Sequence, residues 1–301
     1  MEPLIALLLV AVLSATVLLV RPLLRARHRE RLRSAPFPTE WERILIERLR
    51  LYPRIPDRIR QELRGHILIF LAEKRFFGCG GLEITDAMRV LIAAQACLLI
   101  LNRKTDYYRK LRSILVYPSA FIVNREIVDQ AGVHTSWREP RIGESWEVGR
   151  VIISWDEVEP DERDRDRGEN VVLHEFAHQL DEEDGIADGT PVLGARVRYD
   201  VWAQVLGAEY RALREKVTRG EATLIDPYGA EDAGEFFASA TECFFERPGP
   251  LCKQHPTLYA TLRDYYRLDP AVWHQDGTNE SGSRTETAVL SRRLHSGGQQ
   301  E

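Results

Sequence analysis

The segment that most constrains this chain is residues 171–178 (VVLHEFAH), which contain the pattern H-E-x-x-H. Apolar residues at helical spacing surround the pattern, and Asn170 is suited to cap the helix that they predict over 170–182. On such a helix His174 and His178 are four residues apart, so both imidazoles project from one face. Paired imidazoles on a buried helix need a partner. The spacing therefore predicts two protein ligands of one Zn²⁺ ion.

Two acidic residues of the same helix are candidates for roles beside the metal. Glu175 is rotated by about 100° from His174, which directs it toward a water on the metal rather than toward the metal itself. Asp181 lies seven residues after His174, on the histidine face, where its carboxylate could accept the second N–H of an imidazole. Glu175 is thus the candidate general base, and Asp181 a candidate orienting residue.

A catalytic zinc site needs a third protein ligand and one open position. Residues 226–245 (DPYGAEDAGEFFASATECFF) place acids on an otherwise apolar predicted helix. Glu235 and Glu242 are seven residues apart in this segment and share a face. One is expected to bind the metal and the other to orient a ligand or to cap the helix. The residue pattern alone does not choose between them.

The N-terminal region predicts a membrane anchor. Residues 4–20 are apolar and uncharged, and six arginines follow between positions 21 and 33. Seventeen helical residues rise about 25 Å, at the short end of what crosses a bilayer. A cleaved signal peptide is the alternative, but its basic residues would precede the apolar run. We expect a transmembrane helix at 1–24 and a basic juxtamembrane linker at 25–39. By the positive-inside rule, this is a single-pass protein of the inner (cytoplasmic) membrane whose catalytic domain faces the cytoplasm.

The order of the remaining elements predicts an α+β fold, with mostly helices around a small mixed sheet. Strands are expected at 114–123 and 148–155, and residues 151–155 are a candidate edge for pairing with an extended peptide. The folded domain is expected to span residues 40–275, and the polar residues 276–301 to be disordered. The further helices are expected at 40–50, 57–75, 85–101, 196–219, 231–247 and 256–267.

The charge balance argues against a nucleic-acid partner. The chain has 41 Lys and Arg and 46 Asp and Glu, so its formal net charge is −5. The folded part of a nucleic-acid-binding protein is normally dominated by basic residues. Its four cysteines form no C-x-x-C pair, which favours reduced thiols over a disulfide framework.

The chain resembles the zinc-dependent peptidases of the Mlc titration factor A family. The resemblance is carried by residues 78–103 (GCGGLEITDAMRVLIAAQACLLILNR) and by the segments VIISW, VVLHEFAHQLD and DPYGAEDAGEFFASATECFF. The last two segments are also similar to the catalytic domain of anthrax lethal factor, a gluzincin-type metallopeptidase. This resemblance implies a zincin-like metallopeptidase domain.

The resemblance also implies roles for individual residues. His174, His178 and Glu235 are implied as the ligands of one Zn²⁺, with Glu175 as general base. Tyr228 is implied as the hydroxyl donor to the oxyanion. Lethal factor has a second acid four residues after its glutamate ligand, where this chain has Ser239, and Glu242 is the nearest substitute.

Several functions are consistent with this reading. The favoured one is a zinc-dependent peptidase that hydrolyses peptides or proteins through a metal-activated water, and the resemblance also allows aminopeptidase-like activity. The alternative is a regulator-binding protein with secondary peptidase activity, because family members are associated with a transcriptional repressor of sugar-uptake genes. On spacing alone, a non-peptidase zinc hydrolase or a structural zinc site stays open.

Overall fold

The structure, a computed structural model, describes residues 20–103, 105–119, 121–128, 134–141, 143–144, 149–158, 169–194 and 198–273. Its helices are α2 (Thr39–Arg48), α3 (Asp57–Glu73), α4 (Asp86–Leu98), α5 (Trp155–Val158), α6 (Val171–Asp181), α7 (Tyr199–Thr218), α8 (Ala233–Glu246), α9 (Pro248–Gln254) and α10 (Pro256–Tyr266), with the 3₁₀ turns η1 (Tyr52–Arg54) and η2 (Pro227–Ala230). Its strands are β1 (Arg75–Gly78), β2 (Ser113–Tyr117), β3 (Phe121–Val128), β4 (His134–Arg141), β5 (Gly143–Glu144) and β6 (Arg150–Ser154).

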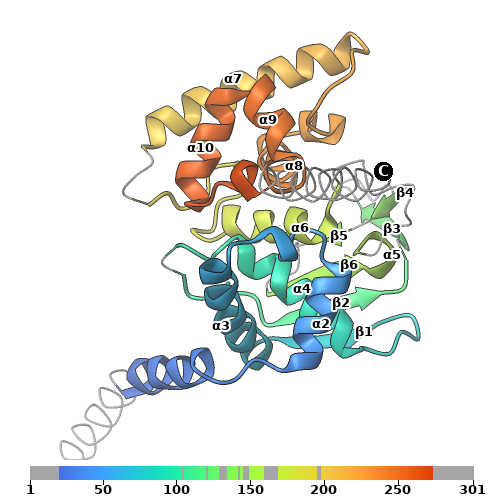
Figure 1. The fold of residues 1–301 in the computed structure, drawn as a ribbon. Helices are drawn as coiled ribbons and strands as arrows, with labels where there is room; N and C mark the ends of the chain where they lie inside the picture. Colours follow the sequence, from blue (N-terminus) through green and yellow to red (C-terminus); the bar gives the residue numbers. More distant parts are fainter. Residues whose placement is uncertain are drawn as a thin grey trace, which may run out of the picture.

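The expected α+β architecture is confirmed for the described residues. A four-stranded mixed sheet has the order β1-β2-β6-β5, in which β1, β2 and β6 are parallel and β5 is antiparallel to β6. Strands β3 and β4 form a separate antiparallel pair. In Figure 1 the sheet and α2–α4 form a lower group, α7–α10 form an upper group, and α6 lies between the two.

Helix α4 forms the centre of the lower group. The side chain of Thr85 caps it by accepting a hydrogen bond from the backbone N–H of Met88. Ten of its residues are buried, and it packs against α2, α3 and α6. A helix that is apolar on nearly every face is stable only when other elements surround it, which the fold provides.

The strand predicted at 148–155 is confirmed as β6, whereas the strand predicted at 114–123 is too long and the predicted free edge at 151–155 is wrong. The predicted strand at 114–123 ends at Tyr117, because Pro118 has no N–H to continue the ladder. The segment at 151–155 is not a free edge, because β6 pairs with β2 on one side and with β5 on the other. A peptide therefore cannot pair there without displacing β5.

The expectation of an N-terminal transmembrane helix is contradicted. Within the described part of the chain, no helix is both long and apolar enough to cross a membrane. Residues 1–19 of the expected anchor lie outside the described residues, as does the expected disordered tail at 276–301. The predicted localisation and domain boundaries stay predictions.

The basic segment after position 20 is helical over residues 20–33 and is paired with the folded domain. The guanidinium of Arg29 lies 2.7 Å from the Glu73 carboxylate and 2.8 Å from that of Asp106. Arg25 contacts the same Glu73 carboxylate at 2.9 Å. Although burial raises the pKa of Glu73, hydrogen bonds from Arg29 and Arg25 outweigh it and lower that pKa to about 2.

Gly189 joins the upper group of helices to α6. Its backbone N–H donates to the Asp181 carboxylate at 2.9 Å, and its carbonyl accepts from the indole N–H of Trp202 at 3.0 Å. Its φ is +77°, and a Cβ added there would lie 2.3 Å from the carbonyl oxygen of Ala233. Only glycine allows this close approach to the start of α8.

We predict that Gly189→Ala lowers the free energy of unfolding by about 2–5 kcal/mol, the sum of a left-handed backbone penalty and overpacking. Gly220→Ala is the matched control, because Gly220 has a φ of +66° and nothing within 4 Å of an added Cβ. It should lose only the backbone part, about 1–2 kcal/mol. Urea unfolding of both variants measures the difference, and equal losses would contradict the close packing at Gly189.

Candidate active site

Helix α6 presents the two histidines of the H-E-x-x-H pattern side by side. The helix begins where the Asn170 side chain accepts a hydrogen bond from the backbone N–H of Leu173 at 3.0 Å, as the cap prediction requires. The Nε2 atoms of His174 and His178 lie 3.2 Å apart. Each side chain is about one-sixth exposed, at 15% and 16%. The pair is therefore set at an interface that still reaches solvent.

Helix α8 supplies an acid to the same point. Its first turn is fixed by Asp232, whose carboxylate accepts from the backbone N–H of Glu235 at 2.9 Å. The Glu235 Oε2 atom then lies 3.0 Å from His174 Nε2 and 3.4 Å from His178 Nε2. Among the described residues, these three form the one cluster of His, Cys, Asp or Glu whose ligand atoms all lie within 4.8 Å of one another.

Glu242 separates the roles of the two acids on α8. Its Oε1 atom lies 2.6 Å from His174 Nδ1, and its Oε2 accepts from the backbone N–H of Asn170. An ionised carboxylate only accepts, so His174 donates through Nδ1–H, and its Nε2 carries a lone pair toward Glu235. Glu235 thus faces the cluster of ligand atoms, and Glu242 orients a histidine from behind.

The donor set fits a divalent metal. Ligand atoms at the corners of a tetrahedron around Zn²⁺ are separated by about 3.3 Å, given bond lengths of about 2.0–2.1 Å. The three separations here are 3.0, 3.2 and 3.4 Å. Lone pairs aimed at one another at these distances repel unless a positive charge lies between them.

The electrostatics of the cluster point to the same need for positive charge. Burial lowers the pKa of His174, but the carboxylates of Glu242 and Glu235 outweigh burial and raise that pKa well above its usual value. Burial raises the pKa of Glu235, but the two imidazoles, whose Nε2 atoms lie 3.0 and 3.4 Å from its Oε2, outweigh burial and lower that pKa to about 2. The cluster thus stabilises a cation, whether a proton or a metal ion, between these groups.

Glu175 lies next to the cluster without joining it. It is 4% exposed, and its Oε2 atom has no hydrogen-bond partner among the described residues. Burial raises its pKa to about 7. A buried carboxylate oxygen without a partner is uncommon and is typical of functional sites.

The structure brings Tyr228 to the candidate active site and gives Asp181 a structural contact. Tyr228 lies on η2, where the Asp226 carboxylate accepts from its backbone N–H at 2.7 Å. Its ring centroid lies 6.1 Å from that of His174, and it is 49% exposed. One carboxylate oxygen of Asp181 accepts from Gly189 and holds the loop after α6.

Two residues of the site were not found by sequence reasoning. The Asn170 side-chain amide donates to Gln95 Oε1 at 2.6 Å and to Glu246 Oε1 at 2.7 Å. Gln95 lies on the apolar helix α4, and Glu246 lies one turn after Glu242. A buried amide in an apolar helix needs a partner, and this signal could have indicated Gln95.

Comparison with known proteins agrees with this geometry. The family model described as "Glucose-regulated metallo-peptidase M90" matches residues 24–267. The chain belongs to this metallopeptidase family. The match includes α6 and α8, so the H-E-x-x-H helix and the Glu235 helix both lie within the family region. The resemblance to Mlc titration factor A proteins is likewise confirmed.

Several individual proteins are similar to this M90 family member. An uncharacterised protein of Synechocystis sp. is 42% identical over 239 residues, covering 79% of this chain and 86% of that protein. The Mlc titration factor A of Pectobacterium atrosepticum is 34% identical over 219 residues, covering 72% and 82%. That of Klebsiella pneumoniae subsp. pneumoniae is 33% identical over 219 residues, covering 71% and 82%.

We predict that Glu242→Gln weakens zinc binding by about 10- to 100-fold, because it replaces the charged acceptor that orients His174 with a neutral one. Competition with a chromophoric chelator measures this affinity. Glu209→Gln is the matched control, since Glu209 contacts His255 Nδ1 at 2.7 Å away from the cluster. Unchanged zinc affinity in Glu242→Gln would contradict the orienting role.

Proposed function

We propose that this chain is a zinc-dependent peptidase in which His174, His178 and Glu235 bind the metal. The observation that carries the proposal is the convergence of three lone-pair-bearing atoms beside a buried, unpartnered carboxylate oxygen of Glu175. Membership in a metallopeptidase family supports it. Two nitrogen ligands, one oxygen ligand and tetrahedral separations favour Zn²⁺ over Mg²⁺ or Ca²⁺, which prefer oxygen ligands and higher coordination numbers.

A zinc ion held by these three residues would supply a Lewis acid that lowers the pKa of water and polarises the scissile carbonyl. Glu175 accepts a proton from the attacking water and returns it to the leaving amine. Its position one residue after His174 and its unpartnered oxygen support this role. Glu175 is buried among the apolar residues of α6, which limits contacts between its carboxylate and bulk water.

Tyr228 and Glu242 complete the proposed machinery. The Tyr228 ring lies beside that of His174 and is half-exposed, so its hydroxyl can donate to the oxyanion of a bound substrate. Glu242 keeps His174 in the tautomer that presents Nε2 as a ligand. Tyr228 thus stabilises the anion formed from the substrate, and Glu242 orients one of the metal ligands.

The regulator-binding alternative has narrower support. It rests on the name Mlc titration factor A, which several relatives carry. The cluster of donor atoms with its adjacent carboxylate favours hydrolysis, because a surface that only captured a protein would need neither. Binding of a regulator and peptidase activity are compatible in one chain.

We predict that Glu175→Gln lowers kcat/KM for peptide hydrolysis by about 10³-fold, the usual contribution of a general base. Its zinc content should stay unchanged, because Glu175 is not a ligand. Peptide digestion with metal analysis of the same sample measures both quantities. Glu183→Gln, an exposed change just after α6, is the control for the lost charge. Full activity in Glu175→Gln would contradict the proposed mechanism.

A further inference from the structure

The basic helix at residues 20–33 contacts a strained loop that the proposed chemistry does not use. This loop, residues 105–111, lies between α4 and β2 in the chain. Tyr107 and Tyr108 within it have φ angles of +55° and +53°. Bulky residues rarely adopt the left-handed region, and they stay there only where surrounding contacts impose it. The conformation of the loop therefore depends on the elements that pack against it.

Two arginines of the basic helix hold the outer side of the loop. The Arg29 guanidinium lies 4.6 Å from the centre of the Tyr107 ring and 2.8 Å from the Asp106 carboxylate. Arg33 donates to the Tyr107 hydroxyl at 3.3 Å. The Arg29 side chain is 15% exposed, so salt screens its contacts less than those of an ordinary surface ion pair. Docking of the basic helix thus favours the observed loop conformation.

The docked position of the basic helix is fixed by contacts with α3. A Cβ added to Gly65 would lie 2.8 Å from the Cγ atom of Arg33 and 3.3 Å from its carbonyl oxygen, so the two helices approach closely where α3 lacks a side chain. At the end of α3, the Glu73 carboxylate accepts from both Arg25 and Arg29 at 2.9 Å. Close packing at one point and ion pairs at the other define a single docked position.

The inner side of the loop supports α6. The Tyr108 ring packs edge-on against Phe176, with 5.0 Å between the ring centroids. Phe176 is buried and lies two residues from each histidine of the cluster, about 200° round the helix and so on the opposite face. Lys110 Nζ donates to the carbonyl oxygen of Glu182, directly after α6, at 2.9 Å. The loop thus contacts α6 behind the metal cluster and at its C-terminal end.

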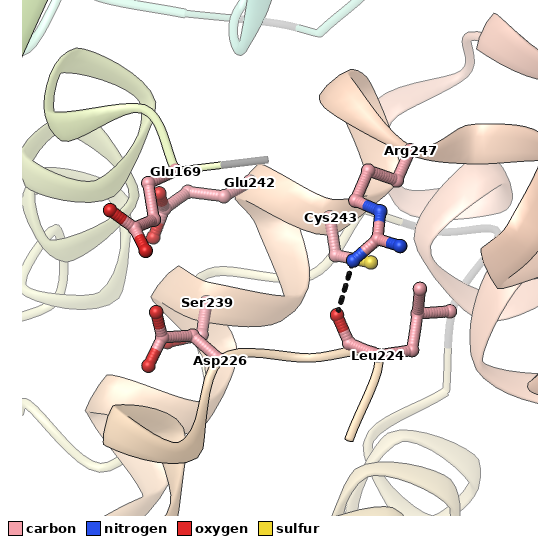
Figure 2. Close-up of a pocket in the computed structure, with 7 residues that line it drawn as sticks. All are labelled: Glu169, Leu224, Asp226, Ser239, Glu242, Cys243 and Arg247. Atoms are coloured by element: carbon pink, nitrogen blue, oxygen red, sulfur yellow. Dashed lines mark hydrogen bonds between the residues drawn. The ribbon is translucent and has the colours of Figure 1, made fainter. Parts of the chain in front are cut away.

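The face of α6 that carries the histidines is held by α8. Glu242 on α8 contacts His174 Nδ1 at 2.6 Å and accepts from the backbone N–H of Asn170. Figure 2 shows the Glu242 side chain extending from α8 toward Glu169, the residue before that helix cap. Helix α6 therefore lies between α8 and the loop. A loop that relaxed would leave α6 supported on one side only, and its histidines would move relative to the glutamate donor on α8.

We propose that docking of the basic helix controls the candidate active site. While the helix is docked, it holds the loop at 105–111 against α6 and keeps the two histidines aligned with Glu235. When the helix is released, the left-handed loop relaxes, zinc is bound more weakly and peptidase activity falls. The inference rests on the proposed peptidase function and adds a conformational control to it. Arg29 and Asp106 are thus positioning residues that act through the loop.

The zinc affinity of the full-length chain, measured by competition with a chromophoric chelator, tests the proposal. Arg29→Gln removes the charge that contacts Tyr107 and Asp106, and we expect about tenfold weaker binding, a typical coupling between two sites. Arg27→Gln, an exposed change on the same helix, is the matched control and should bind zinc as the wild-type chain does. A role confined to stability would lower the urea midpoint of Arg29→Gln and leave its zinc affinity unchanged, which overturns the proposal.

A second variant separates the two helices by packing instead of charge. Gly65→Ala places a Cβ against Arg33 while improving the helix propensity of α3, so it should undock the basic helix without unfolding α3. Zinc affinity should fall as in Arg29→Gln. Gly207→Ala on α7 is the matched control, because an added Cβ there meets only the Arg211 Nη1 atom at 3.5 Å. Wild-type zinc affinity in both Arg29→Gln and Gly65→Ala overturns the proposal.

Thermodynamic linkage provides a measurement in the opposite direction. If docking strengthens zinc binding, zinc must strengthen docking by the same factor. Backbone hydrogen exchange in residues 20–33 of the wild-type chain should therefore slow when zinc is added, by about the factor in affinity that Arg29→Gln loses. Exchange in this helix that is equal with and without zinc overturns the proposal.

These measurements distinguish the inference from the peptidase proposal, because neither requires turnover. A chain whose zinc affinity falls in both Arg29→Gln and Gly65→Ala, but which cleaves no peptide, contradicts the peptidase proposal alone. A chain that cleaves peptides and keeps its zinc affinity in both variants contradicts control by the basic helix alone.

Discussion

Three lone-pair-bearing atoms from two helices are held 3.0–3.4 Å apart, and the surrounding structure is organised to overcome their repulsion. Helix α6 carries two of them, and the first turn of α8 carries the third. Capping by Asn170 and Asp232 fixes where each helix starts, and therefore which residues face each other. Packing of α6 against α8 then fixes the distance between the donor atoms.

Behind the donor atoms, a chain of buried polar groups fixes their orientation. The Glu242 carboxylate contacts His174 Nδ1 and accepts from the backbone N–H of Asn170, the residue that caps α6. The side-chain amide of Asn170 then donates to Gln95 on α4 and to Glu246 on α8. Each member is hydrogen-bonded, so the network can be buried without the cost of an unsatisfied group. The central apolar helix α4 is thereby linked to the candidate site, and a change at Gln95 would be transmitted through Asn170.

Sequence reasoning located the histidines and Glu175 because helical periodicity alone brings positions 174 and 178 to one face. It could not choose between Glu235 and Glu242, because both lie on one face of α8, and only the placement of α8 against α6 decides which acid meets the Nε2 atoms. Gln95 was missed for the same reason, since its partner lies 75 positions away in the chain. The strand break at Pro118 was readable from the missing N–H, whereas the pairing of β5 with β6 depends on tertiary structure.

The account is tested most directly by locating the metal in the purified full-length chain. Zinc analysis combined with anomalous X-ray scattering at the zinc edge should find one Zn²⁺ per chain, bound by the Nε2 atoms of His174 and His178 and by the Glu235 carboxylate. A chain that carries no metal after growth with zinc would contradict the central claim. So would a metal bound elsewhere, with the Glu235 carboxylate turned away from the two imidazoles.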